Sequence, residues 1–209
     1  MTTDEPRPYP AGQPSAPSND HMDTAARLGQ VRSAWLDFYD SEYYEVVRFV
    51  MRAGADLATA EDAAQEAFVA SWELTQEPAR WRAIQDPRGW IRTVALRKYR
   101  RPPGARRKLP LIANADVPDQ PTLGLEPGEL TAQADLLLRA LRGLEEDTRT
   151  AMAFHLDDFP ARTIADLMGQ LGHAGITEQK VRDLLGKARR HLRRDLASLI
   201  EQEGRETDE

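Results

Sequence analysis

Proline places the strongest constraint on how this chain can fold. Six prolines occur between residues 102 and 128, and two of them, Pro102 and Pro103, are consecutive. Proline has no backbone N–H and clashes with the preceding turn of a helix, so a helix that enters this stretch must end near Arg101. The stretch is too long for an ordinary loop within one compact domain. We therefore expect residues 102–130 to form a flexible linker between two domains.

The two ends of the chain are also poor in apolar residues. Five prolines lie within the first 19 residues, and the last nine residues are polar and acidic. Such segments bury too little apolar surface to offset the entropy of ordering them. We expect residues 1–24 to form a disordered leader and residues 201–209 a frayed acidic tail. Residues 25–101 and 131–200 remain as the two folded parts.

Both folded parts are predicted to be helical, because neither shows sustained apolar–polar alternation or clusters of β-branched residues. Apolar residues between Val31 and Met51 recur at spacings that fit one helix or a helix pair. Thr59, with Asp62 three residues later, is a plausible N-cap, and Pro87 suits the first turn of another helix. Beyond the linker the pattern predicts helices over residues 136–144, 148–156, 160–168 and 177–200. The expected fold is all-α, with two small helical domains.

Three of these helices have a clear apolar face. After Thr59 the face consists of Ala60, Ala63, Ala64, Ala67, Phe68, Ser71 and Trp72. After Pro87 it consists of Trp90, Ile91, Val94 and Ala95. In the last helix it consists of Val181, Leu184, Leu185, Ala188, Leu192, Leu196 and Leu199. We expect these faces to form the cores of the two domains.

Several functional classes find no support in the sequence. The chain has no cysteine, which excludes disulfides, cysteine-ligated zinc and thiol catalysis. Its four histidines lie in different elements, and no HExxH pair, glycine-rich phosphate loop or nucleophile elbow occurs. No apolar run approaches the roughly 18 residues that span a bilayer. We expect a cytoplasmic protein without membrane insertion, which is not an enzyme and has no catalytic residues, metal or cofactor.

Charge is distributed in blocks, although the net charge is −6. Residues 53–79 carry six acidic residues and no basic one, whereas residues 88–108 carry nine basic residues and no acidic one. Residues 180–194 carry seven basic residues against Asp183 alone. Charges act locally, over about a Debye length of 8–10 Å, so the blocks matter more than their sum. They suggest one basic and one polyanionic partner, with ordinary solvated helix faces as the alternative.

Three motifs resemble those of a known family. The first is Asp62-Ala-Ala-Gln-Glu-Ala-Phe68 followed by Ser71-Trp72, and the second is Pro87-Arg-Gly-Trp-Ile-Arg-Thr-Val-Ala95. The third begins at Ile176 as Ile-Thr-Glu-Gln-Lys-Val-Arg and ends at Leu192. In this order they resemble regions 2 and 4 of the extracytoplasmic-function (ECF) group of the sigma-70 family of bacterial RNA polymerase sigma factors. The resemblance covers about 170 of the 209 residues.

For residues 25–101 the resemblance implies a region 2 helical bundle that docks on core RNA polymerase. The face that carries Asp62, Gln65 and Glu66 would contact the coiled coil of the β′ subunit. The loop 77–86 would capture an unstacked base, a task that suits a π-face. For Trp81, base capture and burial remain equally open. The resemblance assigns contacts near the −10 promoter element to Trp81, Gln85, Arg88, Arg92, Arg97, Lys98, Arg100 and Arg101.

For residues 131–200 the resemblance implies a region 4 helix-turn-helix that recognises the −35 element and contacts the β flap. Residues 160–168 would form the scaffold helix, and the recognition helix would start at Thr177. The −35 contacts would come from Thr177, Gln179, Lys180, Arg182, Asp183, Lys187 and Arg190. The turn from Gly169 to Gly175 is about six residues longer than in the family. Gly186 stands where many members carry a side chain that faces DNA, and Leu184 replaces a frequent basic residue.

The expected function is therefore that of an alternative sigma factor, which directs promoter-specific initiation and has core polymerase and promoter DNA as partners. The resemblance also implies an anti-sigma protein as a partner. One alternative is a helix-turn-helix regulator that acts on duplex DNA without polymerase; it would account for the second half but not for the acidic face around Asp62. Another is a sequestering decoy derived from a sigma factor.

Overall fold

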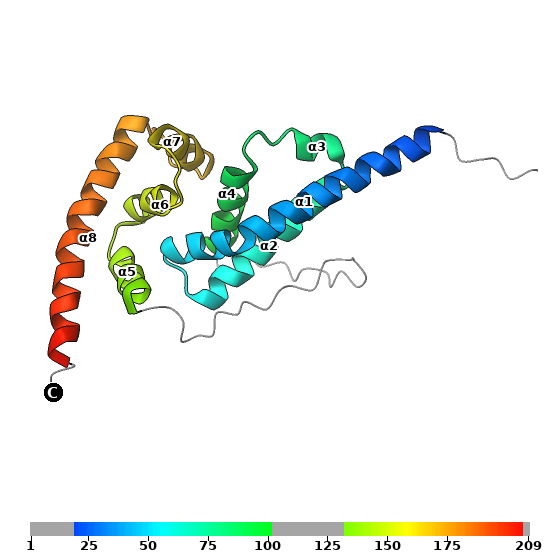
Figure 1. Cartoon of the computed structure of the whole chain (residues 1–209). Helices are drawn as coiled ribbons and strands as arrows, with labels where there is room; N and C mark the ends of the chain where they lie inside the picture. The colour runs from blue at the N-terminus through cyan, green and yellow to red at the C-terminus, as the bar shows by residue number, and fades with distance from the viewer. Residues whose placement is uncertain (1–18, 102–131, 207–209) are drawn as a thin grey trace, which may run out of the picture.

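The computed structural model describes residues 19–101 and 132–206, and every regular element within these ranges is an α-helix. The predicted all-α fold is thus confirmed. Before the gap lie α1 (Asn19–Arg52), α2 (Leu57–Thr75), α3 (Pro78–Arg82) and α4 (Pro87–Tyr99). After it lie α5 (Ala132–Arg142), α6 (Glu146–His155), α7 (Ala161–Gln170) and α8 (Glu178–Glu206) (Figure 1). In the described ranges no helix combines the length and apolarity needed to cross a membrane.

The helices at the two ends are longer than the sequence pattern indicated. Helix α1 begins at Asn19, so residues 19–24, which we assigned to the leader, are helical. Helix α8 continues to Glu206, so most of the tail predicted to fray is helical too. Neither extension contains proline, and residues 201–206 also carry Glu, Gln and Arg, which are good helix formers. The rest of the leader and tail, and the predicted linker, lie outside the described residues.

Helix α2 begins earlier than predicted and has a different cap. Asp56, rather than Thr59, is the N-cap, and its carboxylate accepts a hydrogen bond of 2.8 Å from the backbone N of Thr59. Hydrogen bonds from Thr59 favour the charged carboxylate and lower the pKa of Asp56. Aspartate at this position satisfies an orphan N–H of the first turn, and its N-cap dihedrals suit the role.

The amino-terminal bundle is built on an aromatic cluster between α1 and α2. Trp35 and Tyr39 on α1 stack at 5.4 Å, and Phe68 of α2 meets Tyr39 edge-on at 5.1 Å. The indole N–H of Trp35 donates a buried hydrogen bond of 2.8 Å to the hydroxyl of Ser71. The predicted apolar face of α2 is buried from Ala60 through Ser71, with Trp72 half-buried at its end. Small alanines let the two helices approach closely, which fixes the orientation of α2.

Helix α4 starts where Pro87 predicted and lies across the middle of the molecule. Asp86 caps it by accepting a hydrogen bond of 3.0 Å from the backbone N of Gly89. A side chain at position 89 would lie 3.0 Å from a methyl of Leu167 on α7, so glycine here permits the close approach of α4 to α7.

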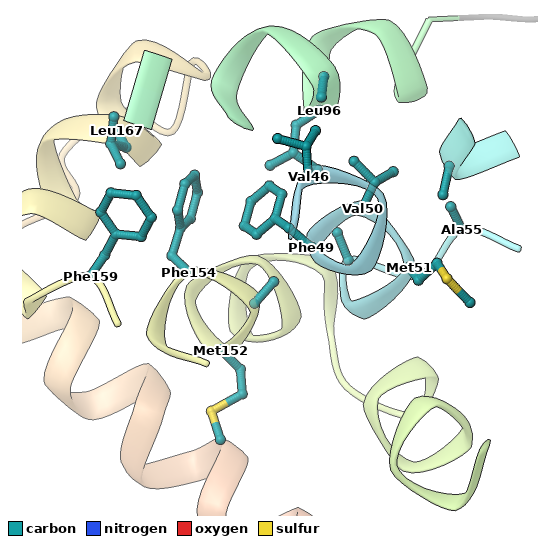
Figure 2. Packing of buried hydrophobic residues seen from close by; sticks show 14 of the residues in the cluster. Val46, Phe49, Val50, Met51, Ala55, Leu96, Met152, Phe154, Phe159 and Leu167 are labelled. Atoms are coloured by element: carbon teal, nitrogen blue, oxygen red, sulfur yellow. The ribbon is translucent and has the colours of Figure 1, made fainter. Parts of the chain in front are cut away.

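The carboxyl-terminal helices pack on α4 and α1 as well as on one another. Helices α6 and α7 lie between α8 and the amino-terminal bundle (Figure 1). The rings of Phe49 on α1 and Phe154 on α6 lie 4.7 Å apart, and Phe159 meets Phe154 edge-on (Figure 2). The buried apolar residues of both halves form one continuous cluster. The two predicted domains therefore share a packed interface in this conformation.

Candidate polymerase and nucleic-acid surfaces

The predicted docking residues on the acidic face of α2 differ in how far they are exposed. Asp62 is exposed on the helix surface, whereas Gln65 and Glu66 are half-buried. The Glu66 carboxylate lies 3.3 Å from Lys98 and 3.8 Å from Arg101, both at the end of α4. The residues predicted for polymerase docking and two of those predicted for DNA therefore adjoin. Asp62 is the member of the docking set most open to a partner.

The segment between α2 and α4 contains the short helix α3, which the sequence pattern did not predict. Trp81 on α3 is half-buried and packs edge-on against Phe38 of α1, with ring centroids 5.7 Å apart. Its ring therefore contributes to packing without being fully buried. Gln85 is exposed and lies at the rim of a hollow of about 480 Å³ between this segment and α7. Trp90 lines the same hollow and is half-buried, not fully buried as a core residue would be.

Arg92 differs most from its prediction. We predicted a DNA contact, but in this conformation its side chain is fully buried. Its guanidinium forms ion pairs with Asp157, at the end of α6, and with Glu42 on α1, the latter at 2.7 Å. A buried guanidinium needs such carboxylates, because an unpaired charge in this position would be very costly. Arg88, on the same side of α4, remains half-exposed and pairs with Glu42 at 3.2 Å.

The basic residues at the end of α4 also contact the carboxyl-terminal half. Arg97 donates a hydrogen bond of 2.6 Å to the backbone oxygen of Gln170, at the end of α7. Arg100 pairs with Glu146 at 3.0 Å and donates to the hydroxyl of Thr150, both on α6. Together with Arg92, three of the predicted −10 residues are thus bound by groups of the carboxyl-terminal half. Arg88, Lys98 and Arg101 pair instead with carboxylates of the amino-terminal bundle, Glu42 and Glu66.

Helices α7 and α8 have the pairing expected of a helix-turn-helix. The apolar stripe of α8 is buried from Val181 to Leu192, against α6 and α7. Thr177 acts as a cap, since its hydroxyl accepts a hydrogen bond of 3.2 Å from the backbone N of Lys180. Six of the predicted −35 residues are exposed on the other face of α8 or at its start: Thr177, Gln179, Lys180, Arg182, Asp183 and Lys187. Arg190 is exposed one turn further on.

Polar contacts on α8 hold some of these side chains without covering them. The Gln179 amide donates to the Asp183 carboxylate at 3.1 Å, and Arg182 pairs with Glu178 one turn earlier. Both pairs are solvent-exposed, so they contribute little to stability and can be replaced by a ligand. Gly186, where the family often carries a DNA-facing side chain, is half-buried.

The long turn between α7 and α8 is ordered by glycine. Gly172 and Gly175 have φ values of 97° and 69°, in the left-handed region that glycine adopts without strain. Between them His173 is partly buried and directs its ring toward α6 and α4. Its Nδ1 lies 3.0 Å from the Asp147 carboxylate, and its Nε2 lies 3.3 Å from Arg100. The long turn thus contacts the basic end of α4 through His173.

Asp157 and Glu42 are the functional candidates that sequence reasoning missed. Asp157 directly follows Leu156, the C-cap of α6. Its neighbour Asp158 has a left-handed φ of 65°, so the chain turns sharply and Asp157 faces inward. One feature of the sequence could have pointed to Asp157 and Glu42. It is Arg92, a charged residue that lies between two residues of the predicted apolar face of its helix. Such a residue requires a buried counter-charge.

No family model matches this chain, and no curated protein matches it either. Within residues 19–101 and 132–206, no cluster of three or more histidine, aspartate or glutamate residues could hold a metal ion.

Proposed function

We propose that this chain is an alternative sigma factor, which binds core RNA polymerase in the cytoplasm and directs it to promoters. The observation that carries the proposal is the surface of α8. Its apolar stripe is buried while the residues that the family uses at the −35 element remain exposed. A recognition helix needs both properties, because one face must be held rigidly while the other enters the major groove.

The α2 surface supports the polymerase part of the proposal. Asp62 is exposed on a helix whose opposite face is fixed by Phe68 and by the buried Trp35–Ser71 hydrogen bond. A rigid helix that presents a carboxylate suits a basic partner surface such as the β′ coiled coil. Charge complementarity of this kind raises the association rate and fixes the orientation of docking.

A helix-turn-helix regulator that acts without polymerase is the second candidate. One observation favours it. In the closed conformation, in which the two halves of the chain pack together, α8 is open to DNA, whereas Arg92, Arg97 and Arg100 are bound to protein groups. Such a chain could bind duplex DNA through α8 alone. The two candidates differ in whether core polymerase is a partner.

Size-exclusion chromatography with purified core polymerase tests the proposal. The wild-type chain should co-elute with core polymerase, and Asp62→Arg should reduce co-elution at least tenfold, because the exposed carboxylate becomes a like charge. The matched control is Glu73→Arg, which makes the same charge change at another exposed position of α2 and should co-elute as the wild type does.

Two results would contradict the sigma-factor proposal. One is a wild-type chain that stays separate from core polymerase at micromolar concentration. The other is equal loss of co-elution in Asp62→Arg and Glu73→Arg, which would indicate a nonspecific charge effect. In the first case, tight binding of the wild-type chain to duplex DNA would favour the regulator. We leave Glu66 unchanged in this test because its replacement would break the contacts to Lys98 and Arg101.

A further inference from the structure

Helix α4 lies between the two halves of the chain and is covered on both sides. Ile91, Ala95 and Leu96 are fully buried, and so is Arg92 on another face of the same helix. Amphipathic surface helices normally keep their basic face in water. Here the carboxyl-terminal half covers Arg92 and contacts Arg97 and Arg100, while Arg88 and Arg101 stay exposed.

The main contact is made by a single carboxylate of the carboxyl-terminal half. Asp157 forms an ion pair with Arg92 and a second, at 3.3 Å, with Arg52 at the end of α1. The Asp157 side chain is only 4% exposed. Phe159, two residues later, lies under both Arg88 and Arg92, at 5.5 and 5.6 Å from ring centroid to guanidinium carbon. The segment after α6 thus offers α4 a negative charge and a π-face, two of the groups that a nucleic acid would offer.

The buried guanidinium of Arg92 has one donor without a hydrogen bond. The Nη2 atom finds no acceptor among the described residues, although Nε and Nη1 are paired. Buried donors in permanent cores are nearly always satisfied. A charged group with one unmet donor is better suited to an interface that separates, after which water or phosphate can complete its hydrogen bonding.

Further contacts come from the end of α7 and the long turn before α8, beside those that Arg100 makes with Glu146 and Thr150 on α6. Arg97 donates to the backbone oxygen of Gln170, and Arg100 reaches His173. These two partners lie at the end of α7 and in the stretch that exceeds the usual helix-turn-helix length. The insertion therefore has a specific role in this conformation, because it holds the basic end of α4.

We propose that the carboxyl-terminal half acts as an internal competitor for the nucleic-acid surface of α4. In the free chain Asp157 and the turn around His173 occupy Arg92, Arg97 and Arg100, and Asp166 and Gln170 of α7 help enclose the hollow beside Gln85. Single-stranded DNA binds this surface only after the two halves separate. The masking of promoter-binding residues rests on the proposed function, whereas the closed conformation can be tested without it.

The absence of cysteine makes the closed conformation directly measurable. Cysteines introduced by Arg82→Cys on α3 and Arg162→Cys on α7, both exposed positions, are the only labelling sites for a donor and acceptor dye. The free chain should show one high-transfer population. When Asp157→Ala and His173→Ala are introduced into the labelled chain, most molecules should shift to low energy transfer between the dyes. The control Asp135→Ala removes an exposed carboxylate that pairs only with Arg139 among the ion pairs of α5, and should leave the transfer unchanged.

A binding measurement then tests whether opening uncovers a nucleic-acid surface. With a labelled oligothymidine of about 20 nucleotides, the Asp157→Ala/His173→Ala chain should bind at least tenfold more tightly than the wild type at low salt. Adding Arg92→Ala should remove most of that gain.

The possible results separate the two proposals. Unchanged transfer in Asp157→Ala/His173→Ala, with helical content retained by circular dichroism, would overturn the internal-competitor proposal. Low transfer without tighter oligothymidine binding would overturn the masking of a DNA surface. If the chain opens but the wild type fails to co-elute with core polymerase, the sigma-factor proposal fails instead. Should Asp157→Ala lose helical content, Asp157→Asn repeats the test with the volume preserved.

Discussion

Tyr39 illustrates how burial changes the chemistry of a side chain in this protein. Its ring lies in the aromatic cluster between Trp35 and Tyr43, and its hydroxyl forms no hydrogen bond to any described residue. Burial, with smaller effects from Tyr43, Tyr44 and Asp40, raises its pKa from 10.0 to about 12. The folded chain therefore holds this proton at a pH at which the unfolded chain has released it.

The Tyr39→Phe variant should be as stable as the wild type at pH 7, or about 1 kcal/mol more stable, because it removes a buried hydroxyl without a partner. The raised pKa means that the wild type loses stability as the pH rises from 10 to about 12, and the variant should lose less. Urea unfolding at pH 7 and pH 11 measures both effects. If the free energy of unfolding of Tyr39→Phe at pH 7 were more than about 1 kcal/mol below that of the wild type, the Tyr39 hydroxyl would have to form a hydrogen bond, which would contradict the prediction.

The burial of some side chains could be predicted from the sequence, and the burial of others could not. The buried face of α2 follows from helical spacing, because Ala60 to Phe68 repeat at three and four residues. The burial of Arg92 does not follow, because its counter-charge Asp157 lies 65 residues away and belongs to another helical segment. Periodicity describes only one helix and its own faces. A contact between two distant segments has no local signature.

At the scale of the element, α8 carries the clearest expected function. Its exposed basic residues should contact DNA phosphates, and each such contact releases counterions. Lys180→Ala should therefore weaken binding to nonspecific duplex DNA and lower the slope of log affinity against log salt by about 0.9. Fluorescence anisotropy over a range of salt concentrations measures the slope.

Arg139→Ala provides the matched control for this prediction. It also removes one exposed positive charge, but on α5, where its partner is Asp135. It should leave the slope unchanged. Equal slopes for wild type and Lys180→Ala, or an equal change in both variants, would contradict a DNA contact at the start of α8.

Most of the helices could be predicted from the sequence, but the residues at which they begin and end were less predictable. Pro87 gave the start of α4, and the apolar stripe gave α8 from Val181 onward. Helix α3 was missed because five residues are too few to show periodicity. The start of α2 was misplaced because both Asp56 and Thr59 can cap a helix, and the choice depends on backbone dihedrals that the sequence does not specify.

At the scale of the whole molecule, the closed arrangement of the two halves was beyond the sequence. Residues 102–131, whose prolines predicted a linker, lie outside the described ranges, yet the helices on either side of them pack together through Phe49, Phe154 and Asp157. Such an interface arises from surfaces that meet only after folding. It also gives the sigma-factor proposal a conformational consequence, since promoter DNA would have to engage a surface of α4 that the carboxyl-terminal half here covers in part.

The most direct test of the sigma-factor account follows dye transfer between Arg82→Cys and Arg162→Cys as core polymerase is added. The account predicts high transfer in the free chain and low transfer in the complex that co-elutes with polymerase. Asp62→Arg should retain high transfer because it does not dock. A chain that stays separate from core polymerase, or one that docks and keeps the transfer of the free protein, would contradict the account.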